Sequence, residues 1–291
     1  DVWYIQHNIP VIRNTYTLHV PQILLDNDWN WIFKPYNYNV GLPALSEPPK
    51  GSTTQLQMKK TFQWVIKDIP AFEYERRMPP SNQYRALVRF SSNDWKTWND
   101  VASWYSKSVF LPQLVPSEAV NKKAHDLIAG KSENKDKIKA LLDFVKNMRY
   151  VAIELGIGGI TPAIPQKVFE RQYGDCKDKS TLLISMMRSV GIPADPVLVL
   201  SANAGVLDPS FPCWRFNHMI VKTEIGDKVY WIDPTAETYD LGELPWTDEG
   251  VYVLVANENS DKLEITPASN ENENLTDVNV KVTNISKTKT N

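Results

Sequence analysis

The stretch YGDCKDKSTLLISMMRSVGIP, residues 173–193, decides how this chain folds. Its apolar residues recur at helical spacing and predict a helix from about Cys176 to Val190. Gly191 and Pro193 predict the end of that helix. The buried face is expected to consist of Leu182, Leu183, Met186, Met187 and Val190. Cys176 therefore falls in the first turn of the helix, directly after a tight turn at Gly174.

This position suits a reactive cysteine. Unpaired backbone N–H groups and the positive end of the helix dipole converge at a helix start, and both stabilise a thiolate. The same N–H groups can hold the oxyanion that forms when a thiolate attacks a carbonyl. The alternative is an inert cysteine of the core. The charged neighbours Asp175, Lys177 and Asp178 weaken that alternative.

A hairpin further along the chain supplies a base and a carboxylate. Gly226-Asp227 is a favoured two-residue loop, and it predicts the pairing of Ile225 with Lys228. In that register Asp233 lies on the same face as His218, roughly 5 to 8 Å away between Cβ atoms. The spacing supports the His–Asp half of a Cys–His–Asp triad. The alternatives are a structural histidine and an Asp-Pro turn at Asp233.

The rest of the second half predicts helices followed by strands. Ser117 is an expected N-cap for a helix that ends near Gly130, and a second helix is expected over Lys135 to Met148. Strands are expected over Pro196 to Leu200, Asn217 to Ile225 and Lys228 to Asp233. Together these elements form an expected α+β core over residues 113–256.

The ends of the chain carry strand patterns. Residues 1–112 predict a β-rich domain, with strands over Thr15 to Val20, Gln55 to Ile69 and Tyr84 to Phe90, and a Pro-rich loop over Gly41 to Gly51. Residues 257–291 predict a polar linker followed by a strand over Thr276 to Val282.

Composition excludes several classes of protein. The 291 residues are 42% hydrophobic and 23% charged, which is typical of a folded domain and argues against global disorder. No apolar run reaches about 18 residues, so no membrane-spanning helix is expected. The net charge of −2, without a basic run, argues against nucleic-acid binding. Two cysteines are too few for a disulfide framework, and four histidines without an HExxH motif argue against catalytic zinc.

The motifs resemble the transglutaminase-like superfamily between about Ser117 and Pro245. They are GDCKDKSTLL at 174–183, GIP at 191–193, FNHMIV at 216–221 and WIDPTA at 231–236. Together with IELGIGGITP at 153–162, they look like a bacterial branch that carries an amino-terminal β-rich domain of unknown function. The resemblance implies a papain-like core, with helices against an antiparallel sheet. It makes Cys176 the nucleophile, His218 the base and Asp233 its orienting carboxylate.

The resemblance also implies a side chain upstream of the cysteine that helps to hold the oxyanion. Tyr150 is the candidate, with a core tyrosine as the alternative, and Glu154 and Asp175 are further candidates for shaping the cleft. No acidic metal loop is visible, so neither a metal nor a cofactor is expected. Relatives with this arrangement are commonly exported, so a periplasmic, cell-envelope or secreted location is expected. The chain begins at Asp1 without a signal segment, as a processed protein or an excised fragment would.

Two functions follow from these observations. The first is a cysteine enzyme that attacks an amide of a peptide, protein or cell-envelope substrate, and hydrolysis is favoured over transfer to an amine. The second is a glycan- or peptide-binding module on a papain-like scaffold. Aromatic clusters at Trp95 to Trp98 and at Trp104-Tyr105 motivate the second function, although core packing explains them more simply.

Overall fold

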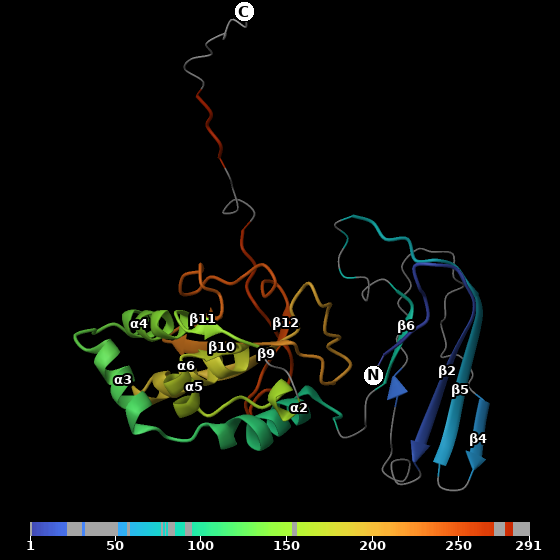
Figure 1. The fold of residues 1–291 in the computed structure, drawn as a ribbon, viewed down its shortest axis with the longest axis horizontal. Coiled ribbons are helices and arrows are strands. Elements are labelled where there is room, and N and C mark those ends of the chain that lie inside the picture. The colour runs from blue at the N-terminus through green and yellow to red at the C-terminus, as the bar shows by residue number, and fades with distance from the viewer. Residues whose placement is uncertain are drawn as a thin grey trace, which may run out of the picture.

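The computed structural model describes residues 2–21, 31–32, 52–56, 59–76, 78, 80, 85–90, 95–152, 156–270 and 277–281. Figure 1 shows a strand-rich part, drawn mainly in blue, beside a larger part built of helices and a sheet. The predicted α+β class, with helices against an antiparallel sheet and a strand-rich region before them, is confirmed. The predicted loop from Gly41 to Gly51 lies outside the described residues.

The strand-rich part contains two three-stranded sheets. One sheet has the order β1 (Val2–Tyr4), β6 (Leu87–Phe90), β3 (Trp31–Ile32), and the other β2 (Val11–Pro21), β5 (Lys59–Ile69), β4 (Ser52–Leu56). The single strand predicted from Gln55 to Ile69 is in fact two antiparallel strands, because Leu56 pairs with Lys59. Residues of β5 and of the segments around β1 and β6 join in a small core, namely Trp3, Ile5, Trp64, Ile69 and Ala86.

The last residues of the predicted β-rich domain are helical. Residues 98–113 are helical, as α2 (Trp98–Trp104), η2 (Tyr105–Phe110) and η3 (Leu111–Gln113). Thr97 caps this segment in a capping box with Asp100. Trp98, Tyr105 and Phe110 are buried in the same core as the later helices. The aromatic composition suggested strands, but burial in this core determines the local structure.

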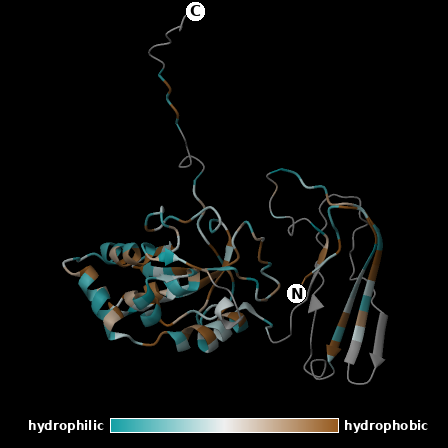
Figure 2. Ribbon diagram, in the orientation of Figure 1, coloured by the Kyte–Doolittle hydropathy of each residue, from teal (hydrophilic) through white to brown (hydrophobic). Residues whose placement is uncertain are grey.

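Four helices follow: α3 (Glu118–Ile128), α4 (Asn134–Lys146), α5 (Pro165–Arg171) and α6 (Cys176–Ser189). The N-cap predicted at Ser117 is confirmed, since its side chain accepts a hydrogen bond from the Val120 amide. Hydrophilic and hydrophobic residues are mixed along α3 and α4 in Figure 2, as expected of helices with one buried face. Helix α6 is buried on nearly every side.

A buried lysine ties α6 to α4. The Lys179 side chain is fully buried, and its ammonium donates to the carbonyls of Lys146, at 3.2 Å, and of Met148, at 3.0 Å. These carbonyls lie at the C-terminal end of α4, where a cation is favourable. Burial lowers the pKa of Lys179. The contact fixes the helix that bears Cys176 against its neighbour.

The sheet of the larger part has the order β11-β10-β9-β12-β13. Its strands are β9 (Asp195–Val199), β10 (His218–Ile225), β11 (Lys228–Ile232), β12 (Tyr252–Val255) and β13 (Glu264–Ile265). Figure 1 shows α6 lying over β10 and β9, and the Ser180 hydroxyl donates to the Met219 carbonyl at 2.9 Å. Helix and sheet therefore meet one residue away from His218.

The predicted polar tail is partly wrong. β13 lies inside the segment predicted as a linker, and Leu263 and Thr266 are buried there. The short apolar run that forms β12 joins β9 to β13 and extends the core past residue 256. Residues 277–281, part of the predicted strand over Thr276 to Val282, form no strand. Among the described residues, no helix is both long and apolar enough to cross a membrane.

Candidate active site

Cys176 is the first residue of α6, as predicted. Asp175 is the N-cap, and its carboxylate accepts a 3.1 Å hydrogen bond from the Asp178 amide. In return, the Asp178 carboxylate accepts a hydrogen bond from the Asp175 amide, and the two bonds form a capping box. The Asp175 carboxylate also pairs with Lys177 at 2.6 Å. Asp175, a predicted cleft candidate, therefore acts as a buried helix cap in the structure.

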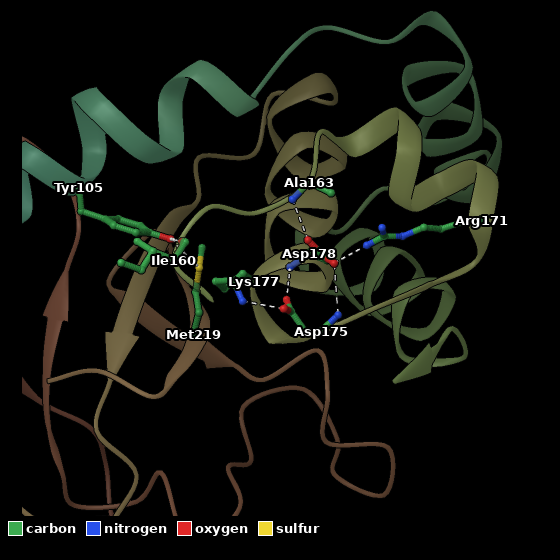
Figure 3. A network of polar contacts seen from close by, with 8 residues as sticks. All are labelled: Tyr105, Ile160, Ala163, Arg171, Asp175, Lys177, Asp178 and Met219. Atoms are coloured by element: carbon green, nitrogen blue, oxygen red, sulfur yellow. Dashed lines mark hydrogen bonds and ion pairs between the residues drawn. The ribbon is translucent and has the colours of Figure 1, made fainter. Parts of the chain in front are cut away.

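The Asp178 carboxylate makes three contacts that fix the turn before Cys176, one of them with the Asp175 amide described above. Its carboxylate accepts from the Ala163 amide at 2.7 Å and forms an ion pair with Arg171 (Figure 3). A Cβ on Gly174 would lie 2.6 Å from the Asp178 Cβ, so this approach requires glycine. The start of α6 is thereby fixed to α5 and to the segment that precedes α5.

The predicted hairpin register is observed. Ile225 pairs with Lys228 and Val221 with Ile232, and Gly226 in the loop has a φ of +58°. His218 begins β10, and its Nε2 lies 3.3 Å from Asp233 Oδ2. Thr235 fixes the other Asp233 oxygen through its amide, at 2.8 Å, and its hydroxyl, at 2.7 Å.

The cysteine and the histidine meet. Cys176 and His218 line the same cavity, and their interaction raises the pKa of His218, whose Nε2 also lies 3.3 Å from Asp233 Oδ2. The structure therefore brings together Cys176, His218 and Asp233, which the sequence placed on a helix start and a hairpin. Both carboxylate contacts of the imidazole use Nε2, so Nδ1 is the nitrogen available to the thiol.

A second carboxylate, which the sequence gave no reason to expect, reaches the same imidazole. Asp248 Oδ2 lies 3.5 Å from His218 Nε2, and the Asp248 side chain is 1% exposed. Asp248 belongs to the connection between β11 and β12. No local pattern in the sequence links this connection to His218, because the contact depends on where the sheet places it.

The pKa values of His218, Asp233 and Asp248 are shifted by burial and by their neighbours. Burial lowers the pKa of His218, but hydrogen bonds with Asp233 and Cys176 outweigh it and hold the pKa well above its ordinary value. Burial acts to raise the pKa of Asp233, yet its bonds to His218 and Thr235 lower it overall. Burial raises the pKa of Asp248 to about 6. The site therefore favours an imidazolium ion beside an ionised Asp233.

A cavity of about 150 Å³ opens at Cys176 and His218. Its walls include the apolar and aromatic side chains of Tyr105, Ile160, Leu198, Trp214, Phe216 and Met219. Lys177 and Asn217 add polar groups to the lining. The cavity can hold one substrate side chain beside the sulfur.

Tyr105, rather than Tyr150, is the tyrosine of this cavity. Its hydroxyl lies 3.4 Å from the Ile160 carbonyl and 3.6 Å from Met219 Sδ (Figure 3). Burial, with the nearby Cys176 and Asp175 charges, raises its pKa. Tyr150 lies on β7 (Arg149–Tyr150), paired with β8 (Tyr173–Gly174), and is 45% exposed. Glu154 lies outside the described residues.

The predicted aromatic clusters pack beside the site. Tyr105 stacks on Trp214 with ring centroids 5.3 Å apart, and Trp104 meets Trp95 and Trp214 at 5.4 Å each. Trp98 is buried, and its indole donates to the Pro209 carbonyl at 2.7 Å. These rings build the wall behind the cavity, so the alternative of core packing describes them better than a glycan platform.

His218, Asp233 and Asp248 also bring possible metal-binding atoms within 4.8 Å of one another. The same atoms make the imidazole–carboxylate contacts described above. We therefore assign this cluster to the orientation of the imidazole, and the absence of a metal stays a prediction.

A family model and one crystal structure agree with this architecture. Residues 121–233 match the family model of the transglutaminase-like superfamily, and no curated protein sequence matches the chain. A crystal structure described as a "putative protease" from Parabacteroides distasonis superposes with a TM-score of 0.62 at 20% identity, covering 91% of this chain and 47% of that one. This chain thus spans about half the length of that protein. A "putative cysteine protease" from Cytophaga hutchinsonii gives a TM-score of 0.34 at 13% identity, covering 90% and 77%.

Proposed function

Starting from the transglutaminase-like core over residues 121–233, we propose that this chain is a cysteine enzyme that cleaves amide bonds through a thioester. Cys176 is the nucleophile, His218 the general base and acid, and Asp233 the carboxylate that orients the imidazole. One observation carries the proposal: Cys176, at the start of α6, lies at the same cavity as His218, whose Nε2 is 3.3 Å from Asp233 Oδ2.

The first half of the reaction forms the thioester. His218 takes the proton of the Cys176 thiol, and the thiolate sulfur attacks the amide carbonyl carbon. Backbone N–H groups at the start of α6 hold the resulting oxyanion, and the hydroxyl of Tyr105, which lines the same cavity, is the proposed side-chain donor. The C–N bond then breaks, and the imidazolium of His218 gives its proton to the leaving amine.

The second half releases the acyl group. His218 takes a proton from water, the water oxygen attacks the thioester carbon, and the C–S bond breaks. The proton held by His218 returns to the sulfur. A primary amine in place of water would give transfer instead of hydrolysis. We favour hydrolysis, because nothing in the site requires a second groove that excludes water.

The substrates we propose are peptides, proteins or amides of the cell envelope, and the location is the periplasm, envelope or exterior. The aromatic side chains beside the sulfur, Tyr105, Trp214 and Phe216, fit an amide whose acyl side carries an apolar side chain. Fractionation of cells that express the full-length protein tests the location. Recovery in the cytoplasm alone would contradict it.

A peptide-library assay tests the function. The wild-type chain is incubated with a mixture of peptides, with and without a primary amine, and products are identified by mass spectrometry. We expect hydrolysis by the wild type and by Cys213→Ala, and none by Cys176→Ala or His218→Ala. A Cys176→Ala variant that keeps the wild-type rate would refute the proposal, and amine adducts as the main product would reassign it to acyl transfer.

A further inference from the structure

Two buried carboxylates meet at one nitrogen of His218. Nε2 lies 3.3 Å from Asp233 Oδ2 and 3.5 Å from Asp248 Oδ2, and the two aspartate side chains are 4% and 1% exposed. A Cys–His–Asp arrangement uses only one such carboxylate. Two buried carboxylates repel each other unless a cation lies between them. The imidazolium form of His218 is that cation.

The main chain and the side chain of Asp248 make different contacts. The loop is held through the main chain of this residue: the Asp248 amide donates to the Pro245 carbonyl at 2.8 Å, and the Asp248 carbonyl accepts from the Thr266 hydroxyl at 2.6 Å. The side chain instead receives hydrogen bonds from Ser201, at 3.4 Å, and from Thr247. These bonds leave Oδ2 directed at the imidazole.

Ser201 links this carboxylate to the histidine strand. The Ser201 amide donates to Asn217 Oδ1 at 2.9 Å, and Asn217 directly precedes His218. Asp248 is therefore positioned by the same short segment that positions the imidazole. A carboxylate held only for packing would not require this coupling.

We propose that Asp248 is a second positioning residue for His218, which acts with Asp233 to hold the imidazole in place and in its protonated form. This inference rests on the proposed function, since it concerns the same site. Each carboxylate oxygen accepts a share of the Nε2–H hydrogen bond, and the ring is held between them. The nitrogen that faces Cys176 is thereby kept in line with the sulfur.

The charge of Asp248 changes with pH. The charged groups that face it are His218 from β10 and Asp233 from the end of β11. Burial raises its pKa, the His218 imidazolium opposes the rise and Asp233 adds to it, so that the pKa is about 6. Above that pH Asp248 becomes an anion and strengthens its hold on the imidazolium.

Titration of the His218 imidazole by ¹⁵N NMR tests the inference without any substrate. The full chain is compared with Asp248→Asn, which keeps the shape and removes the charge. A unit charge at this distance changes a pKa by about one unit even in water. We expect the His218 pKa to fall by about one unit in Asp248→Asn, and the inflection near pH 6 to disappear. A titration curve that superimposes on the wild-type curve would overturn the inference.

If Asp248→Asn does not fold, the same titration of Ser201→Ala tests the inference. The Ser201 hydrogen bond lowers the pKa of Asp248, so its removal should move the inflection near pH 6 to higher pH. An unmoved inflection would also count against the inference. With an active substrate, we expect Asp248→Asn to lower kcat and to leave KM nearly unchanged. A failure of the proposed function would appear separately, as amide hydrolysis that survives Cys176→Ala.

Discussion

The Ser180 hydroxyl donates a 2.9 Å hydrogen bond to the Met219 carbonyl, and this bond joins the two halves of the site. Ser180 lies one turn after Cys176 on α6, and Met219 directly follows His218 on β10. Ser180 is fully buried. The sulfur and the imidazole come from segments far apart in the sequence, and this contact fixes the distance between those segments.

Ser180→Ala should therefore cost both stability and activity. A buried hydrogen bond that loses one partner costs about 1–3 kcal/mol. Thr181→Val is the matched control, because the neighbouring Thr181 hydroxyl is buried and has no hydrogen-bond partner. We expect urea unfolding to show a loss for Ser180→Ala and almost none for Thr181→Val. Equal losses in both variants would refute the role assigned to this bond.

Tyr105→Phe should lower the rate without loosening the fold. The ring would stay stacked on Trp214 while the hydroxyl at the cavity is removed. Loss of one oxyanion donor costs about 100-fold or more in kcat. Tyr150→Phe, at the half-exposed tyrosine that the sequence favoured, should leave kcat nearly unchanged. The opposite ranking of the two variants in steady-state kinetics would return the role to Tyr150.

Thr235→Val should weaken the orientation of Asp233. The variant removes the hydroxyl that lies 2.7 Å from Asp233 Oδ1 and keeps the amide that lies 2.8 Å from the same oxygen. We expect kcat to fall about tenfold, the effect of about 1.4 kcal/mol on a barrier, with KM little changed. A change in KM alone would mean that Thr235 acts on substrate binding and not on the imidazole.

The free energy of unfolding of Asp248→Asn should rise relative to that of the wild type as the pH rises from 4 to 7. Asp248 has a pKa of about 6 in the folded protein against 3.8 as a reference, so the folded state binds more protons in between. Ionisation of the wild-type residue then lowers stability as pH rises through this window, by at most about 3 kcal/mol. Urea unfolding at pH 4 to 7 measures the difference, to which Asp233 and His218 contribute in both proteins. A difference that does not vary with pH would contradict the assigned titration.

The sequence predicted what local patterns determine. The start of α6 follows from Asp175 and the glycine turn, and the hairpin register follows from Gly226-Asp227. The hairpin register was sufficient to place His218 and Asp233 within reach of each other, and the helix start placed Cys176 in the first turn of α6. Family resemblance added the expectation that the helix and the hairpin face each other.

The remaining features depend on contacts between distant segments. Tyr105 precedes Cys176 by several elements, and Asp248 reaches His218 only because β12 joins the sheet beside β9. The aromatic residues at 98–105 have strand propensity, yet burial against Trp214 and Phe216 makes them helical. Tertiary contacts of this kind override local preference and leave no periodic signal.

Alkylation of the native protein tests the central claim most directly, because it asks whether the Cys176 sulfur is activated by His218. The full chain is treated with a limiting amount of iodoacetamide, and the adduct is mapped by mass spectrometry in the wild type and in His218→Ala. The account predicts rapid modification of Cys176, little of Cys213, and a strongly reduced rate in His218→Ala. Modification of Cys213 in preference to Cys176, or a Cys176 rate unaffected by His218→Ala, would contradict it.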